Sequence, residues 1–247
     1  MKEFVKKFIG WLATTKFLQY PRKIVKRIIS YAIQSKNVNV SCCDYLDNPG
    51  KLKAMDLVKK IRNERELCIE DCEGYQIFMA VKNTAKVNGD IAEIGVYKGG
   101  SAALICEVKE NKTLYLFDTF EGLPDLCEMD NLKVINKGQF LGEFEDVKAY
   151  LKKYSNVYIY KGLFPSTADP IKNKRFSFVN LDVDLYKSTL SCLEFFYSKM
   201  NKGGIIISHD YTNTNAQGVR KAFDDFFKEK PEPIIELSGS QCLIVKC

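Results

Sequence analysis

The sequence predicts an α/β fold built on a doubly wound, mostly parallel sheet of seven strands, with a helical extension at the N-terminus. From about residue 90, short apolar runs of the β type alternate with helical patterns, which is typical of parallel strands joined by crossover helices. Glycine or acidic residues follow several of these runs, at the edge of such a sheet where ligands bind. The 247 residues, 46% of them hydrophobic, are sufficient for one sizeable core.

Residues 1–34 are predicted to form a basic amphipathic helical arm, in which Glu3 is the only acid among several Lys and Arg residues. A membrane-spanning helix needs about 20 apolar residues, and lysines interrupt this stretch well before that length. Two interpretations stay open: peripheral contact with an anionic membrane surface, or packing against protein, either the chain's own domain or a second copy in a homo-oligomer. We favour packing against protein.

Residues 35–89 have a mostly helical pattern, and we expect them to form a cap or substrate-binding region over the carboxyl edge of the sheet. The nine cysteines of the chain show no C-x-x-C spacing, which indicates free thiols in a reducing cytoplasm. Cys106, Cys192 and Cys242 lie in apolar segments and should be buried. Basic residues do not interleave with aromatic ones around the strand ends, so no nucleic-acid partner is expected.

The main domain is predicted to span residues 90–247. Its first five strand-like runs read DIAEIGV, TLYLFDT, VYIYKG, FSFVNLDVD and GGIIISHD, beginning at residues 90, 113, 157, 176 and 203. Helical patterns follow the first, fourth and fifth runs, and Pro231 ends the last helix. PIIELSG and QCLIVKC then predict two closing strands, which should be antiparallel neighbours because only a few residues separate them.

The ends of the first two strands suggest a nucleoside site. The first strand leads through Gly95, Gly99 and Gly100 into a helix, so the backbone can turn tightly and approach a ligand. Asp118 ends the second strand, about 20 residues later, where an acid commonly binds ribose hydroxyls. The phosphate-loop pattern is absent, so S-adenosylmethionine fits the turn better than a dinucleotide does. The alternatives are a glycine turn without a ligand and an aspartate that only stabilises a turn.

Five ordered blocks are spread over residues 90–245: AEIGVYKGGS, LFDTFEGLP, LDVDLYKST, GGIIISHDY and GVRKAFDDF. In these blocks the chain resembles the macrocin O-methyltransferase-like (TylF/MycF) family, which has a Rossmann-like methyltransferase fold. The resemblance implies S-adenosylmethionine as methyl donor, a divalent metal, usually magnesium, and a hydroxyl of a sugar or glycosylated small molecule as acceptor. It assigns residues to two groups: Glu93, Gly95, Gly99, Ser101 and Asp118 to the cofactor, and Asp182 and Asp210 to the metal.

One position departs from the family pattern of two consecutive aspartates before a tyrosine, because this chain has His209 followed by Asp210. His209 is the only histidine of the chain, and it is predicted to be either a metal ligand or the general base. An imidazole ligand favours manganese, iron or zinc more than an aspartate does, so magnesium and manganese both remain candidate metals.

Asp182 and Asp184 flank one valine at the end of the fourth strand-like run. Alternate residues of a strand point the same way, so both carboxylates are expected to face one cavity. A cation at Asp182 would relieve their repulsion, and Asp184 would be free to act as the catalytic base. Tyr186, Tyr211 and Asn213 are candidates for the acceptor pocket.

Two other functions compete with methyl transfer. An apolar strand that ends in Asp-x-Asp also occurs in metal-dependent nucleotide-sugar glycosyltransferases, although these do not need both the glycine turn and Asp118. A membrane-associated binding module that lost its activity through His209 is the third interpretation.

Overall fold

The computed structural model describes residues 49–131 and 133–247, so the predicted arm at residues 1–34 lies outside the described residues. The chain divides into two compact units, Met1–Leu52 and Lys53–Cys247, and the second unit contains the whole sheet. Within the described ranges, no helix has the length and apolar character needed to cross a membrane.

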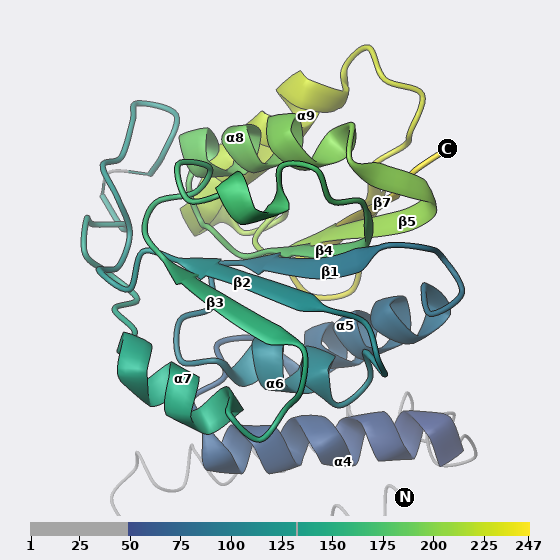
Figure 1. Cartoon of the computed structure of the whole chain (residues 1–247). Helices are drawn as coiled ribbons and strands as arrows, with labels where there is room; N and C mark the ends of the chain where they lie inside the picture. The colour runs from purple at the N-terminus through teal and green to yellow at the C-terminus, as the bar shows by residue number, and fades with distance from the viewer. Residues whose placement is uncertain (1–48, 132) are drawn as a thin grey trace, which may run out of the picture. The chain divides into compact units, whose positions relative to one another are not determined.

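The sheet has seven strands in the order β3-β2-β1-β4-β5-β7-β6 (Figure 1). The strands β1 to β5 are parallel neighbours, whereas β7 pairs antiparallel with both β5 and β6. The predicted α/β class and the antiparallel closing pair are therefore confirmed. Their bounds are β1 Asp90–Ile94, β2 Leu114–Asp118, β3 Val157–Lys161, β4 Phe176–Leu181, β5 Met200–Ser208, β6 Ile235–Glu236 and β7 Cys242–Val245.

Helices cover both faces of the sheet (Figure 1). The helices α8 and α9 pack on one face, and α4, α5 and α6 pack on the other. The helical elements are α4 Pro49–Glu64, α5 Asp71–Asn83, α6 Gly100–Cys106, α7 Phe144–Leu151, η2 Asp169–Ile171, α8 Tyr186–Tyr197, η3 Thr214–Ala216 and α9 Gln217–Phe227. The helical character expected before residue 90 thus appears in α4 and α5, and, of the described residues before 90, those at 66–69 line the cavity described below.

Two hydrophobic clusters explain why the central strands are apolar throughout. Along β2, Leu114 and Leu116 belong to the cluster under α4, α5 and α6, whereas Tyr115 and Phe117 belong to the cluster under α8 and α9. Successive side chains of a strand point to opposite faces, so a strand covered on both sides buries every residue. The described cysteines are free thiols, and Cys106, Cys192 and Cys242 are buried as predicted.

The fourth strand is shorter than the sequence predicted. It ends at Leu181, and Asp184 lies in the following turn with a left-handed φ of +58°. The expectation that Asp182 and Asp184 face one cavity through strand alternation was therefore wrong, although both residues do line that cavity. Left-handed residues also follow the neighbouring strands, at Tyr97, Phe120 and Asp210. Sharp turns after the strands thus direct most of these side chains into the site, while Asp118 reaches it from the last position of β2.

Candidate active site

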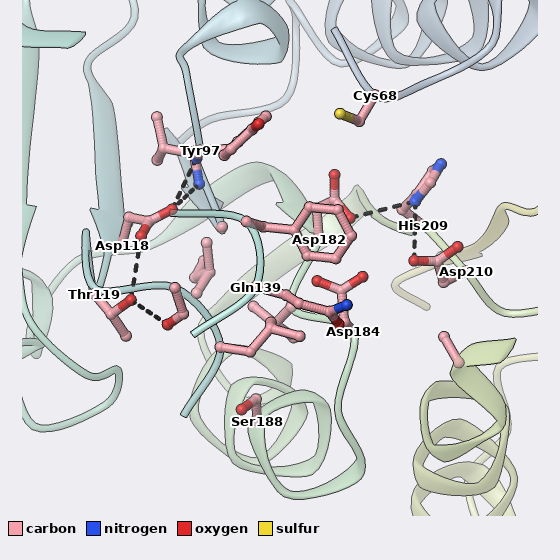
Figure 2. A pocket seen from close by; sticks show the side chains of 18 of the residues that line it. Cys68, Tyr97, Asp118, Thr119, Gln139, Asp182, Asp184, Ser188, His209 and Asp210 are labelled. Atoms are coloured by element: carbon pink, nitrogen blue, oxygen red, sulfur yellow. Dashed lines mark hydrogen bonds and ion pairs between the residues drawn. The ribbon is translucent and has the colours of Figure 1, made fainter. Parts of the chain in front are cut away.

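A cavity of about 380 Å³ opens at the carboxyl edge of the sheet (Figure 2). The turns after β1, β2, β4 and β5 form its base, and the segment between α4 and α5 contributes Glu66, Leu67, Cys68 and Ile69. Further walls come from the loop after β2, including Ile135 and Phe140, and from the loop after β3. Ligands of open α/β sheets bind at this edge, so the cavity lies where the fold predicts a site.

Gly95 brings the ends of β1 and β4 together. It has a φ of +87°, and a Cβ atom at this position would lie 1.7 Å from the carbonyl oxygen of Asp182. Its amide donates to Phe117 O at 2.9 Å, and the amide of Asp182 donates to Ile94 O at 2.9 Å. Only glycine allows this approach, so Gly95 sets the distance between the predicted donor turn and the predicted metal ligands.

The other predicted residues of the glycine turn occupy two kinds of position. Ser101 lies in the first turn of α6 and lines the cavity together with Gly95 and Gly100. Gly99 is the N-cap of α6 with a φ of +80°, and its Cα faces Val147 of α7. Gly99 therefore shapes the turn, while Gly95 and Ser101 border the space that a ligand would occupy.

Asp118 lines the cavity and also ties two turns together. Its Oδ2 accepts hydrogen bonds from the amides of Val96 and Tyr97 at 2.7 and 2.8 Å, and its Oδ1 accepts one from the amide of Phe120 at 2.7 Å. The contact with Tyr97 is visible in Figure 2. Part of the carboxylate's hydrogen-bonding capacity thus holds the glycine turn. This is the turn-stabilising role that the sequence analysis gave as the alternative to ribose binding.

Glu93 lies behind the turn, on the sheet face that carries α5 and α6. Its side chain is fully buried, and Oε1 accepts a hydrogen bond from Asn180 Nδ2 at 2.8 Å. Burial raises the pKa of Glu93 to about 8, even though the hydrogen bonds of Ser101 and Asn180 favour its charged form. The structure therefore places Glu93 under the predicted cofactor turn, where it can act on a ligand only through that turn.

Asp182, His209 and Asp210 come together as the sequence predicted (Figure 2). His209 Nδ1 lies 3.3 Å from Asp182 Oδ1 and 3.3 Å from Asp210 Oδ2. One ligand atom from each of the three residues lies within 4.8 Å of the others. Among the described residues, these three are the group found with the spacing of a metal site.

The cluster contains a fourth residue that the sequence reasoning missed. Glu73 Oε2 lies 3.1 Å from His209 Nε2, although 136 residues separate them in sequence. The segment that begins at Glu70 carries a capping-box pattern, which indicates only the start of a helix. Nothing in that local pattern indicates a contact with a strand end so far along the chain.

The charges of this cluster shift the pKa values of its members. Burial alone would lower the pKa of His209, but the charges and hydrogen bonds of Asp182, Asp210 and Glu73 raise it well above its usual range. Burial opposes ionisation of Glu73 and Asp210, yet contact with His209 lowers the pKa of each to about 2. In this structure the imidazole thus holds a positive charge among carboxylates.

Asp184 lies beside the cluster and lines the same cavity. Burial, followed by repulsion from Asp182 and Asp210, raises the pKa of Asp184 well above its usual range. Asp210 also accepts a hydrogen bond from Asn213 Nδ2 at 2.7 Å.

Two of the three candidates for the acceptor pocket point elsewhere. The hydroxyl of Tyr186 donates to Asp225, and that of Tyr211 donates to Asp224, so both side chains serve contacts with α9. Asn213 does line the cavity. The prediction for the two tyrosines was therefore wrong, because aromatic residues at strand ends here pack on the neighbouring helix.

Comparison with known proteins identifies the family. The family model described as macrocin-O-methyltransferase (TylF) matches residues 73–240. The chain belongs to this family. Its match begins at Glu73 and includes every predicted site residue, which favours the methyltransferase interpretation over the glycosyltransferase one.

Two curated relatives come from Streptomyces. Demethyldecarbamoylnovobiocin O-methyltransferase of Streptomyces niveus is 27% identical over 67% of this chain and 64% of its own length. A tetracenomycin rhamnosyl 4'-O-methyltransferase of Streptomyces olivaceus is 28% identical over 62% of this chain and 64% of its own length. This chain thus spans somewhat less than two thirds of the length of both relatives.

Solved structures confirm the fold. The O-methyltransferase NovP superimposes with a TM-score of 0.61 at 22% identity, covering 69% of this chain and 78% of its own. The calicheamicin methyltransferase CalS11 gives a TM-score of 0.63 at 18% identity, covering 81% of this chain and 93% of its own. At these identities the likeness establishes the Rossmann-like methyltransferase architecture.

Proposed function

We propose that this protein is an S-adenosylmethionine-dependent O-methyltransferase that uses a divalent metal and methylates a hydroxyl of a sugar or glycosylated metabolite. One observation carries the proposal: the glycine turn at Gly95, the strand end at Asp118 and the cluster of Asp182, His209 and Asp210 all border a single cavity. A methyl donor and an acceptor held in one cavity can be brought into the alignment that methyl transfer requires.

The donor half of the cavity is assigned to the turn after β1 and the end of β2. S-adenosylmethionine, when bound, supplies the methyl group as a sulfonium. The protein contributes the close backbone approach at Gly95, the hydroxyl of Ser101 and the carboxylate of Asp118, which holds that turn in place. The apolar walls at Leu123 and Ile135 suit the adenine ring, because they exclude water from its faces.

The residues of the acidic cluster fit a divalent metal. Two carboxylate oxygens lie 3.3 Å from an imidazole nitrogen, and the three atoms converge from separate turns. Such a mixed nitrogen and oxygen donor set suits manganese, iron or zinc, and can also hold magnesium. A bound metal would supply Lewis acidity, which lowers the pKa of an acceptor hydroxyl.

Asp184 is the proposed base. It lines the cavity beside the metal ligands, and its raised pKa brings the carboxyl group nearer to neutral pH, where a general base works best. His209 is the predicted alternative base. Its Nε2 contacts Glu73, and its Nδ1 lies with oxygens of Asp182 and Asp210 in the group that has metal-site spacing, so we assign it to the metal.

The acceptor class rests on the relatives. The Streptomyces olivaceus relative is named for a rhamnosyl-tetracenomycin, and CalS11 is also described as a TDP-rhamnose 3'-O-methyltransferase. We extend this acceptor class to the present chain. We also propose, from the sequence alone, that the protein works in the cytoplasm and that residues 1–34 mediate self-association or peripheral membrane contact.

Transfer of radiolabelled methyl groups to a panel of glycosides tests the proposal. Chelation with EDTA should abolish transfer, and added Mn²⁺ or Mg²⁺ should restore it. Asp182→Ala should lower turnover by about 100-fold or more, since one of three ligands is lost, while donor binding stays intact. Full turnover of the metal-free wild type, or of Asp182→Ala, would reject the assignment of this site.

A further inference from the structure

We propose that Glu73 is a positioning residue for the metal site: it holds His209 Nε2–H, so that Nδ1 of the same ring faces Asp182 and Asp210. This inference rests on the metal site of the proposed function. It adds a residue from α5 to a site that otherwise comes from the ends of β4 and β5.

The side chain of Glu73 is fixed before it meets His209. It is 2% exposed, and its Oε1 accepts hydrogen bonds from the amide and the hydroxyl of Ser240 at 2.7 and 2.8 Å. Its Oε2 accepts one from the amide of Glu70 at 2.7 Å. Gly239 makes room for this arrangement, because a Cβ atom there would lie 2.6 Å from Glu73 Oε1. The carboxylate is therefore held from the helix start and from the loop before β7.

The ring of His209 must distribute its protons among acceptors on both sides. Both oxygens of Glu73 already accept hydrogen bonds, from the Glu70 amide and from Ser240, and Oε2 lies 3.1 Å from Nε2, so the carboxylate pairs with an N–H on Nε2. Nδ1 then faces two further carboxylate oxygens at 3.3 Å. In the metal-free protein a proton on Nδ1 can bridge these oxygens, and a metal ion that replaces this proton would meet the same three atoms.

A metal-ligating histidine commonly donates its second N–H to a carboxylate, which fixes the tautomer and raises the basicity of the ligating nitrogen. The contacts of Glu73, His209, Asp182 and Asp210 have this arrangement. An aspartate in place of the histidine would have no N–H to offer Glu73. The pair of Glu73 and His209 thus acts as one unit that provides a nitrogen ligand, and it favours metals that prefer nitrogen.

The capping box offers a purely structural explanation of Glu73. It accounts for the bond to the Glu70 amide but not for the contact with His209. Glu70→Gln is a matched control for Glu73→Gln: it makes the same chemical change at the same helix start and alters the other half of the capping box.

Because the chain contains a single histidine, NMR of protein carrying ¹⁵N-labelled histidine reports this site alone. The measurement uses the full chain with a tag free of histidine and a titration with Zn²⁺. Cysteine-bound Zn²⁺ elsewhere does not produce imidazole signals. In the wild type we expect Zn²⁺ to bind Nδ1, with the proton retained on Nε2. Glu73→Gln should weaken this binding by about 10- to 100-fold, while Glu70→Gln should stay close to the wild type.

Each outcome decides the inference. Zn²⁺ bound at Nε2 in the wild type would overturn it, even if neither variant folds. Equal Zn²⁺ affinity of Glu73→Gln and Glu70→Gln would also overturn it and leave the proposed metal site standing. If the wild-type imidazole responded to neither Zn²⁺ nor Mn²⁺, the metal site itself would fail, whereas donor binding and methyl transfer would remain separately measurable.

Discussion

At the scale of single residues, the site differs from the predicted family pattern at His209. The histidine contacts three carboxylates, two in the cavity and one at the start of α5. The sequence was sufficient to predict Asp182, His209 and Asp210 as a group, because each follows a strand that ends at the same edge. It was insufficient for Glu73, because the contact depends on how α5 packs against the strand ends.

Replacing His209 by aspartate tests what the nitrogen contributes. The variant offers three carboxylates to a metal, which suits magnesium, and leaves Glu73 without its partner. We expect the ratio of Mg²⁺ to Mn²⁺ affinity to rise by about 10-fold or more, and the metal-free variant to melt at a lower temperature than the wild type. Calorimetric titrations with both ions check this. An unchanged affinity ratio would show that His209 is not a ligand.

At the scale of elements, turns at the strand ends build the site. The sequence predicted the positions of the central strands well, because apolar runs covered on both faces have a clear pattern. It placed the end of β4 too late, since Leu181, Asp182 and Val183 read as a continuous strand while the backbone already leaves the sheet after Leu181. Left-handed conformations at non-glycine residues such as Asp184 and Asp210 have no local sequence signature.

Comparing Gly95→Ala with Gly138→Ala distinguishes two costs of adding a Cβ atom: the strain of a positive φ, which both variants have, and a steric clash, which only Gly95→Ala has. Both glycines have positive φ, +87° and +84°, but a Cβ atom at Gly138 meets nothing within 4 Å while one at Gly95 meets Asp182 O at 1.7 Å. We expect Gly138→Ala to lower the free energy of unfolding by about 1 kcal/mol, and Gly95→Ala by about 4 kcal/mol or more. Urea denaturation measures both. Equal losses would contradict the close approach of β1 and β4.

Asp118→Ala tests the link between the turns after β1 and β2. The change leaves the amides of Val96, Tyr97 and Phe120 without their acceptor, so the turn that borders the donor site loosens. We expect S-adenosylhomocysteine affinity to fall by about 10-fold or more and the free energy of unfolding to fall by about 2 kcal/mol. Calorimetry and denaturation give the two values. Reduced stability with unchanged affinity would make Asp118 a turn residue only.

At the scale of the whole molecule, the fold and the family follow from the same features. The alternation of strands and helices predicted the parallel sheet, and the short spacing between β6 and β7 predicted their antiparallel pairing. The family match then confirmed the resemblance carried by the five sequence blocks. Burial of single polar residues was not predictable in this way: the family resemblance assigned Glu93 to the cofactor, and the structure buries its side chain under the predicted cofactor turn.

Glu93 should impose a pH dependence on stability. Its pKa rises from 4.5 to about 8 on folding, so between these values the folded protein keeps a proton that the unfolded chain releases. The contribution of Glu93 to the free energy of unfolding therefore falls as pH rises from 4.5 to 8. Glu93→Gln removes this pH dependence. The free energy of unfolding of the variant minus that of the wild type should therefore rise by on the order of 3 kcal/mol between pH 5 and pH 8. Urea denaturation of both proteins at both pH values measures this difference. The same difference at pH 5 and pH 8 would contradict the burial of this carboxyl group.

The assignment of the cavity to a methyl donor can be tested by calorimetric titration of the purified protein with S-adenosylhomocysteine and, separately, with uridine diphosphate in the presence of Mn²⁺. We expect S-adenosylhomocysteine to bind at one site per chain with micromolar affinity, and Asp118→Ala to weaken this binding. Uridine diphosphate should give no comparable heat. Binding of uridine diphosphate without binding of S-adenosylhomocysteine would contradict the assignment of the cavity to a methyl donor.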